Sequence, residues 1–495
     1  MKLSLKTQAN PENILIAEEH RTHLPVVRIT RIVLQNFKNV EYGEICFHCG
    51  RHSDSKETDG TKSDILGLYG QNGSGKTAVI DALYILKQLL RGSKVQDLFS
   101  ECIAKGADFA KLTFLFELRY EDGRVRKAQY EFCLASEPIP EDTEYRIEAA
   151  PDFTAVPLSR FRVRVFDEVL SMSGPFHGND QRMNPVIDTT GKEIPFGPKS
   201  RHKYLIGADK DSRDREFRLE VNKRLARDRS QSFIFMQDTL KTLKDCGNYS
   251  DYYQVILELN HFGSHYLFVV NTRSSGLIRL NLALLLHTPQ GSFPIQTDRP
   301  CNMPQDVYEI VSTYIPKVSS VISRLVPGLS LKLKTLGEPV MKDGSTGQLV
   351  EAIAVRNGTE LPLRDESDGI RRIISVLSLL TAAYNDPSFT LAIDEFDAGI
   401  FEYIWGELLE IFAESGKGQL IFTAHNLRPL EVLNKKFLYF TSTDPKDRYV
   451  QLKSIARTNN MRNVYFRQIE NGNEEKVYNE TKRNDIKEAL QNAKE

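Results

Sequence analysis

The octet GQNGSGKT, residues 70–77, holds three glycines, a lysine and a threonine at a spacing suited to binding an anion. Because glycine has no Cβ, successive backbone N–H groups can turn inward around a phosphate without steric clash. Lys76 can reach the β- and γ-phosphates of a nucleotide, and the Thr77 hydroxyl can ligate Mg²⁺. The octet therefore predicts a phosphate-binding loop, and a tight turn alone is the alternative. The residues expected to contact the nucleotide are Asn72, Gly73, Ser74, Gly75, Lys76, Thr77 and Ala78.

A pair of carboxylates, Asp394 and Glu395, follows the apolar stretch FTLAI. A strand here would deliver both side chains at its carboxyl end, where the ligands of open α/β sheets gather. We expect Asp394 to hold Mg²⁺ through water. We expect Glu395 to orient or deprotonate the attacking water, a role that changes rates by about 10²–10⁴. The alternative is that both are ordinary exposed loop carboxylates.

Two further stretches carry candidate phosphate contacts. His425 ends the apolar stretch QLIFTA, where its imidazole could donate to a γ-phosphate, although a lone histidine at a strand end is usually structural. Ser367, Asp368 and Gly369 directly precede a segment with helical periodicity. A hydroxyl, a backbone N–H and a helix N-terminus together make an anion site. Taken alone, the same three residues are also an ordinary helix N-cap.

The elements that must position these residues follow from hydrophobic periodicity. Alternation of apolar and polar residues predicts a strand over 26–34, and a short apolar run predicts another over 64–70. Apolar residues at helical spacing predict a helix over 78–90. Residues 110–135 are typical of a hairpin that turns at Asp122-Gly123. From residue 367 onward, helices and strands alternate, which favours a parallel sheet with crossover helices.

The segments between these motifs are less regular. Residues 136–205 are rich in proline and glycine and predict loops with short strands. Residues 209–229 predict a charged helix with eight basic and six acidic residues, a balance that favours a solvated surface over a DNA contact. Residues 305–326 predict a helix interrupted at Pro316. Strands are expected over 329–337 and 347–363, with a turn at Asn357-Gly358. No sustained heptads are present, so no long coiled coil is expected.

Composition excludes few classes of partner. Acidic and basic residues nearly cancel, 66 against 65, and the net charge of −1 gives no argument for nucleic acid or membrane. No apolar run reaches the roughly 18 residues that a membrane span requires, and the N-terminus lacks the apolar core of a signal peptide. We therefore expect a cytoplasmic protein with no membrane partner.

The cysteines do not predict a metal site. Cys46 and Cys49 form one CxxC, with His48 and His52 nearby. A structural zinc site usually needs a second ligand pair, and no other CxxC occurs in the chain.

Together, these stretches resemble the ATP-binding-cassette (ABC) ATPases, in particular the soluble branch that contains the structural-maintenance-of-chromosomes (SMC) proteins, RecF and the OLD-like defence ATPases. ITRIVLQNFKNV, residues 29–40, resembles the opening strand of that branch. ESDGIRRI resembles a degenerate form of its signature motif that keeps Ser367 and Gly369. The resemblance covers residues 26–135 and 305–445, and is closest to bacterial AAA-15/AAA-21-type ATPases.

The resemblance implies an α/β fold: an ABC-ATPase head with a P-loop α/β core, an antiparallel β subdomain, a compact helical or irregular insert and no long coiled coil. It implies ATP and Mg²⁺ as cofactors. Two heads would enclose two ATP molecules, so that Ser367 and Gly369 contact the γ-phosphate on the neighbouring copy. Asp397 stands at the position of the D-loop aspartate. The Q-loop glutamine would be Gln237 or Gln129, and Gln237 is preferred.

The function implied by the resemblance is a switch ATPase that forms a homodimer or higher oligomer, with Lys76, Glu395 and His425 as catalytic residues. The leading hypothesis is the sensor or regulatory ATPase of a bacterial anti-phage defence system, acting with a separate effector protein encoded nearby. The alternative is a RecF/SMC-like DNA-repair ATPase that binds DNA. A transporter subunit and a scaffold without turnover fit less well. The bases that could contact DNA are Arg28, Arg31, Lys38, Arg371 and Arg372.

The expected organisation places the insert between two halves of the ATPase. The tail is too short for the nuclease domain that OLD nucleases append, so any cutting of nucleic acid would need a partner. The expected segments are an N-terminal lead-in (1–25), an N-lobe with the P-loop (26–135), an insert or lid (136–304), a C-lobe with the remaining motifs (305–445) and a C-terminal tail (446–495).

Overall fold

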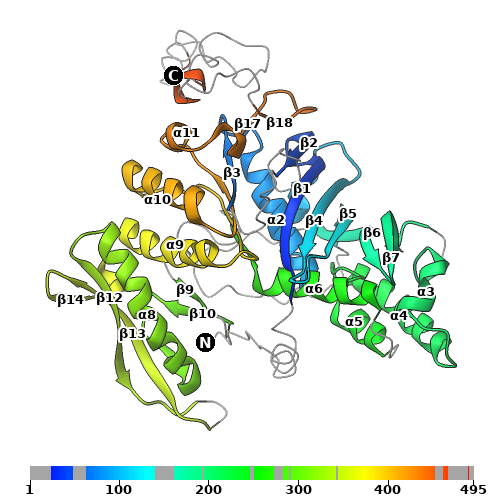
Figure 1. Cartoon of the computed structure of the whole chain (residues 1–495), viewed down its shortest axis with the longest axis horizontal. Coiled ribbons are helices and arrows are strands. Elements are labelled where there is room, and N and C mark those ends of the chain that lie inside the picture. The colour runs from blue at the N-terminus through cyan, green and yellow to red at the C-terminus, as the bar shows by residue number, and fades with distance from the viewer. Residues whose placement is uncertain are drawn as a thin grey trace. The chain divides into compact units, whose positions relative to one another are not determined.

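A computed structural model provides the fold (Figure 1). The described residues are 24–47, 63–139, 161–191, 194–245, 250–271, 283–288, 291–341, 344–451, 461–465 and 489. The chain forms two compact units, each assembled from two separate segments. The first unit contains Met1–Phe47 and Ile85–Ser264, and the second contains His48–Tyr84 and His265–Glu495. The predicted five-part division stays a prediction.

The first unit contains an antiparallel sheet with the strand order β2-β1-β4-β5-β6-β7. The predicted opening strand is confirmed as β1, and the predicted hairpin is confirmed as β4 and β5, with Gly123 at a φ of +84° in its turn. The six strands are β1 (Val26–Phe37), β2 (Val40–Cys46), β4 (Ala110–Arg119), β5 (Val125–Pro138), β6 (Phe161–Phe176) and β7 (Asn179–Asp188).

The prediction of loops with short strands over 136–205 is wrong for residues 161–188, whereas residues 140–160 and 192–193 lie outside the described part of the chain. β6 has 16 residues and β7 has 10, and they extend the sheet beyond β5. The turn residues misled the prediction because Gly174 and Pro185 lie inside these strands, where the β6–β7 register shifts. Irregular register of this kind lets a strand continue through residues that usually end one.

Helices complete the first unit. The predicted charged helix is confirmed as α4, and its buried residues Leu219 and Ala226 lie on one face while Arg224 pairs with Glu220 at the surface. The helical segments are η3 (Asp97–Cys102), η4 (Lys199–Arg201), α3 (His202–Leu205), α4 (Ser212–Asp228), α5 (Gln237–Lys244) and α6 (Asp251–His265), which ends one residue beyond the unit.

The second unit contains a sheet with the strand order β18-β17-β3-β16-β15-β8. Every neighbouring pair is parallel except β17 and β18, which confirms the predicted parallel sheet. Four of its strands are buried at every position, as expected when both faces of a parallel sheet are covered. The strands are β3 (Asp64–Tyr69), β8 (Leu267–Val270), β15 (Thr390–Ile393), β16 (Gln419–Thr423), β17 (Leu438–Thr441) and β18 (Tyr449–Val450).

Helices follow three of these strands, namely β3, β15 and β16. α2 begins directly after the loop that ends β3, and it runs from the second unit into the first. The Trp405 side chain of α10 is fully buried and packs edge-to-face on Phe396. The helical segments are α2 (Lys76–Leu90), α9 (Asp368–Asn385), α10 (Glu402–Ser415), α11 (Pro429–Val432) and η6 (Lys435–Phe437).

The described part of the second unit also contains two antiparallel sheets, the helix α8 and the short 3-10 helix η5. β9 (Ala283–Thr288) pairs with β10 (Gly291–Gln296), and β13 pairs with β11, β12 and β14. The predicted turn at Asn357-Gly358 is confirmed by left-handed φ angles of +50° and +83°. The remaining elements are β11 (Cys301–Pro304), α8 (Gln305–Leu325), β12 (Leu329–Gly337), β13 (Gly347–Arg356), β14 (Thr359–Pro362) and η5 (Leu363–Asp365).

The predicted interruption at Pro316 is wrong, because α8 continues through it for 21 residues. Pro316 is exposed, whereas Val311, Ile315 and Val318 are buried on one face on either side of it. Packing of that face outweighs the missing backbone hydrogen bond. α8 is the longest helix in the described ranges, and none of the described helices is long and apolar enough to cross a membrane.

A buried polar row ties three strands of the parallel sheet together near their amino ends. The Gln419 amide donates to the Asp64 carboxylate at 3.1 Å, and the Thr390 hydroxyl donates to the Gln419 carbonyl oxygen at 3.2 Å. All three side chains are almost completely buried. They lie on β16, β3 and β15, the strands whose other ends carry the motifs, so this row helps to hold the register on which the motifs depend.

Replacing Gln419 with alanine should lower the free energy of unfolding by about 3 kcal/mol, because buried partners lose hydrogen bonds and a cavity is left. Urea unfolding followed by circular dichroism measures this. The control is Gln451→Ala, which removes one bond from a partly exposed glutamine to the Lys436 carbonyl. Equal losses in the two variants would contradict a role for the buried row.

Candidate functional site

The predicted phosphate-binding loop connects β3 to α2 at the carboxyl edge of the parallel sheet (Figure 1). Gly70, Gly73 and Gly75 have φ angles of +147°, +75° and +104°, which residues with a Cβ rarely adopt. At Gly70, a Cβ would lie 1.8 Å from the Thr441 hydroxyl oxygen. Asn72 and Gly73 are exposed at the tip of the loop, whereas Ser74, Gly75 and Ala78 are buried beneath it. Packing therefore requires glycine at position 70, and the left-handed φ angles at positions 73 and 75 favour it there.

Lys76 is folded back over this loop. It is only 7% exposed, and its ammonium donates to the carbonyl oxygens of Gly70 at 2.8 Å and Gln71 at 3.1 Å. Burial lowers the pKa of Lys76, and the charges of nearby Asp394, Glu395 and Asp397 oppose that shift. The lysine thus lies among the carboxylates of the second motif and is already desolvated, which strengthens its interaction with any anion in the loop.

Thr77 and Asp394 meet at the carboxyl edge of the sheet. The Thr77 hydroxyl lies 3.4 Å from the Asp394 carboxylate, which is 3% exposed. A hydroxyl and a carboxylate that face each other match the oxygen ligands that Mg²⁺ prefers, so the pair fits this ion. In the described part of the chain, no group of three or more histidines, cysteines, aspartates and glutamates is placed to hold a metal. An ion here would take its remaining ligands from phosphate and water.

Thr423, which the sequence interpretation missed, organises both carboxylate residues. Its buried hydroxyl donates to the Asp394 carboxylate at 2.6 Å and accepts from the Glu395 backbone N–H at 2.8 Å. The parallel register pairs Ile393 with Phe422, so the next residues along the two strands, Asp394 and Thr423, lie side by side. The sequence did hold a signal for Thr423. If FTLAIDE and QLIFT are aligned as neighbouring parallel strands, the threonine that ends QLIFT falls beside the carboxylate pair.

Glu395 itself has a left-handed φ of +47°, uncommon for a residue with a Cβ. This turn directs the chain away from the strand immediately after Asp394. Glu395 is half-buried, and its backbone carbonyl accepts a bond of 2.5 Å from the guanidinium of Arg372 on α9. A sharp, braced turn of this kind separates the directions of two adjacent carboxylates and allows them to take different roles.

Asp397 bridges the loop after β15 to the loop after β16. Its carboxylate accepts from the backbone N–H groups of His425 at 3.0 Å and Asn426 at 2.5 Å. The His425 side chain is exposed. Asp397 therefore fixes the backbone of His425, the predicted γ-phosphate contact. The sequence interpretation did not assign this role to Asp397.

The signature-like residues lie at the start of α9. Ser367 is exposed and is the N-cap of the helix, since its hydroxyl accepts from the Ile370 N–H at 3.4 Å. A Cβ on Gly369 would lie 2.9 Å from the Gly399 carbonyl oxygen, so Gly369 allows close packing on the loop that contains Asp397. The role of Ser367 and Gly369 at a neighbouring nucleotide stays a prediction.

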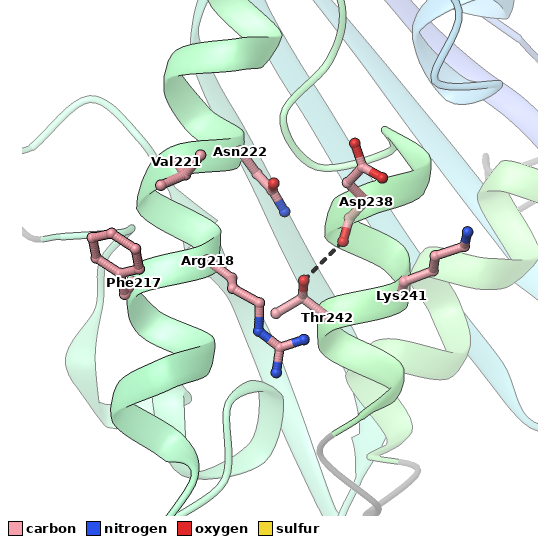
Figure 2. Close-up of a pocket in the computed structure, with 7 residues that line it drawn as sticks. All are labelled: Phe217, Arg218, Val221, Asn222, Asp238, Lys241 and Thr242. Atoms are coloured by element: carbon pink, nitrogen blue, oxygen red, sulfur yellow. Dashed lines mark hydrogen bonds between the residues drawn. The ribbon is translucent and has the colours of Figure 1, made fainter.

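Gln237 lies in the first unit, as the first residue of α5. Figure 2 shows a hollow of about 380 Å³ between α4 and α5, where the next residue, Asp238, is part of the lining. The assignment of Gln237 to the Q-loop stays a prediction. The alternative, Gln129, lies within β5, and its amide donates to Glu131.

The bases proposed for DNA contact do not form an exposed basic surface. Arg28 and Arg372 are buried, at 5% and 3% exposure. Arg31 pairs with Glu44 at 2.8 Å, and Arg371 pairs with Asp368. Arg28 and Arg372, which the sequence interpretation named as possible DNA contacts, are therefore not available at the surface. Within the CxxC, Cys49, with His48 and His52, lies outside the described residues.

Comparison with known proteins gave no match to a protein-family model or to a curated protein sequence. Similar solved structures include an SMC head bound to the C-winged helix domain of ScpA, which is 14% identical, with 86% of this chain and 98% of that chain covered and a TM-score of 0.38. Another is the SMC head domain from Thermotoga maritima, at 12% identity, 86% and 99% coverage and a TM-score of 0.34. A third is the recombination mediator protein RecF, at 13% identity, 87% and 99% coverage and a TM-score of 0.32.

Replacing Asp397 with alanine should loosen the loop after β16, because the His425 and Asn426 amides lose their acceptor. We expect those amides to exchange hydrogen more than about tenfold faster, given the strength of bonds to a charged group. Hydrogen–deuterium exchange of a peptide that spans 424–428 measures this. Asp444→Ala, which removes a comparable bond from the Lys446 N–H, is the control and should leave that peptide unchanged. Unaltered exchange in the Asp397 variant would refute the bridging role.

Proposed function

We propose that the chain binds ATP with Mg²⁺ and hydrolyses it, as a switch ATPase of the ABC type. The observation that carries this proposal is the convergence of Lys76, Thr77 and Asp394 at one edge of one parallel sheet, with the Thr77 hydroxyl 3.4 Å from Asp394. A glycine-rich loop, a buried lysine and an oxygen ligand pair together match what a nucleoside triphosphate and its metal require.

In the proposed reaction, the loop glycines present backbone N–H groups to the phosphates at the N-terminus of α2. Lys76 exchanges its bonds to the Gly70 and Gln71 carbonyls for phosphate oxygens. Thr77 and Asp394 would hold Mg²⁺, which supplies charge neutralisation for the transferred phosphoryl group. Thr423 keeps the Asp394 carboxylate in place through its 2.6 Å bond.

Glu395 is the general base of the proposed reaction. It orients water and takes its proton as the bond from the water oxygen to the γ-phosphorus forms. The bond between the γ-phosphorus and the β–γ bridging oxygen breaks, and ADP leaves with inorganic phosphate as the other product. Thr423 accepts from its backbone N–H and Arg372 donates to its backbone carbonyl, so the peptide units before and after its Cα are both held. His425 donates to the γ-phosphate from a loop that Asp397 fixes.

Glu395→Gln should keep ATP affinity within about twofold of the wild type and lower the hydrolysis rate by at least about 100-fold, because glutamine cannot accept the proton. Lys76→Ala should instead lose ATP binding, because the triphosphate loses its buried cation. Binding of a fluorescent ATP analogue and phosphate release with Mg²⁺ measure the two effects. Unchanged turnover in Glu395→Gln would refute the catalytic assignment, and unchanged affinity in Lys76→Ala would refute the binding site.

We further propose that two copies enclose the nucleotides, with Ser367 and Gly369 of one copy completing the site of the other. The exposure of Ser367 at the N-terminus of α9 supports this, because its hydroxyl and the helix N-terminus are open to a second copy. ATP would then hold the pair together, and hydrolysis would release it, which couples chemistry to a change of assembly.

With Mg²⁺ and ATP, the Glu395→Gln variant should show twice the 56.4 kDa mass of one chain by light scattering. Adding Ser367→Arg should abolish the doubling, because a long cation would fill the contact. Glu41→Arg, on an exposed position of β2, is the control and should leave it intact. A doubled mass that persists with Ser367→Arg would contradict the shared site.

The biological role that we propose is a regulatory ATPase of a bacterial anti-phage defence system with a separate effector protein. Its support is the sequence resemblance together with a site built for nucleotide rather than for cutting nucleic acid. The RecF-like alternative requires direct DNA binding, and the burial or pairing of Arg28, Arg31, Arg371 and Arg372 argues against the bases first considered. DNA affinity that falls steeply with rising salt would favour that alternative.

A further inference from the structure

The β17–β18 hairpin contacts the phosphate-binding loop through two side chains. Tyr449 on β18 is 4% exposed, and its hydroxyl donates to the Gly75 carbonyl oxygen at 2.9 Å. Burial raises the pKa of Tyr449, so the hydroxyl stays protonated and remains a donor at physiological pH. This contact joins residues 374 positions apart in the chain.

The bond from Tyr449 sets the direction of the peptide unit between Gly75 and Lys76. In a trans peptide unit, the carbonyl and the following N–H point in opposite directions. Anchoring the Gly75 carbonyl on Tyr449 therefore turns the Lys76 N–H away from the hairpin. Gly75 has a φ of +104° and no Cβ, so its own backbone would permit many other orientations.

Thr441 on β17 contacts both ends of the same loop. Its hydroxyl shares a 2.5 Å hydrogen bond with the Ser74 hydroxyl and lies 3.2 Å from the Tyr69 carbonyl oxygen. Ser74 in turn donates to the Gln71 carbonyl oxygen. Thr441 is fully buried, and its hydroxyl fills the space that a Cβ on Gly70 would need. The loop is thus fastened at its beginning and its end.

The two strands of the hairpin are hydrogen-bonded to each other, so the hairpin can support the loop as one unit. Thr441 and Tyr449 are directly opposite each other in the β17–β18 register. Beyond them, the Ser442 N–H donates to the Arg448 carbonyl at 2.8 Å, and the Arg448 guanidinium donates to the Ser442 carbonyl at 2.6 Å. On its other side, β17 pairs in parallel with β3, which leads into the loop.

We propose that Thr441 and Tyr449 are positioning residues of the nucleotide site, which hold the phosphate-binding loop in its anion-binding form before nucleotide arrives. The inference rests on the proposed function and extends it to a hairpin outside the recognised motifs. Preorganisation of the loop lowers the conformational cost of binding. Loss of the support should therefore raise the KM for ATP with little change in kcat, because Thr441 and Tyr449 contact the loop and the residue before it.

The first test is Tyr449→Phe, which removes one hydroxyl and leaves the ring. We expect the Kd for a fluorescent ATP analogue with Mg²⁺ to rise about three- to tenfold, as for one neutral hydrogen bond. The matched control is Tyr69→Phe. Tyr69 is equally buried and directly precedes the loop, but its hydroxyl has no hydrogen-bond partner within the described ranges. Equal affinities in the two variants, or a change confined to the melting temperature, would overturn the proposal.

Thr441 provides an independent test with a conservative rescue. Thr441→Val replaces the hydroxyl with a methyl group of similar size, and should weaken ATP binding to a similar extent. Thr441→Ser keeps the hydroxyl and should restore affinity to within about twofold of the wild type, since the shared bond to Ser74 can form again. Weakened binding in the serine variant equal to that in the valine variant would contradict a role for the hydroxyl.

Hydrogen–deuterium exchange of the nucleotide-free protein separates this inference from the proposed function. Tyr449→Phe should increase exchange over residues 70–78, and Tyr69→Phe should not. If the wild type fails to bind ATP, the proposed function is wrong, and the exchange result still decides whether the hairpin holds the loop. Unchanged exchange over 70–78 would overturn the inference even in a protein that binds and hydrolyses ATP.

Discussion

Parallel pairing of β3, β16 and β15 is the constraint on which the candidate site depends. Parallel strands end at a common edge, so the segments that follow them are brought together wherever they lie in the chain. The glycine-rich loop follows β3, the carboxylate pair follows β15, and His425 follows the end of β16. A slip of one residue between β15 and β16 would move Thr423 away from Asp394 and Glu395, so that the Asp394 carboxylate and the Glu395 backbone N–H would lose their common partner. The buried row at the opposite ends of these strands opposes such a slip.

The charges at this edge form a second constraint. Lys76 and Arg372 are two buried cations, and burial lowers the pKa of each. The carboxylates of Glu395 and Asp397 oppose both shifts, and Asp394 also opposes that of Lys76. A triphosphate would add further negative charge to a site in which three carboxylates already face two cations. The N-terminus of α2 and a divalent ion are the physical means of accommodating it. The Lys76 ammonium donates to backbone carbonyls, whose dipoles stabilise its charge where water is excluded.

Periodicity and motif spacing were sufficient for much of this organisation. The opening strand, the hairpin at Gly123, the charged helix and the alternating elements after residue 367 are all confirmed, because each depends on local patterning that one face of an element must satisfy. The mixed α/β fold with a parallel and an antiparallel sheet is confirmed as well. The failures arose where tertiary packing overrides local preference. β6 and β7 persist through glycine and proline because neighbouring strands pair with them, and α8 passes Pro316 because its buried face continues on both sides.

The sequence alone determined the chemistry available to this protein. The types and order of Lys76, Thr77, Asp394, Glu395 and His425 follow from short motifs, since a glycine-rich turn and a strand that ends in carboxylates are local properties. Only the tertiary structure decided which side chains hold those groups in place. These side chains contact the motifs across long stretches of the chain: 28 positions for Thr423 and for Asp397, 23 for Arg372, 367 for Thr441 and 374 for Tyr449. Asp397 was singled out by its motif, but its contact was not. No local pattern marks the contacts of these residues, because a single hydroxyl, carboxylate or guanidinium gains its role from the strand register and packing that place it beside a distant partner.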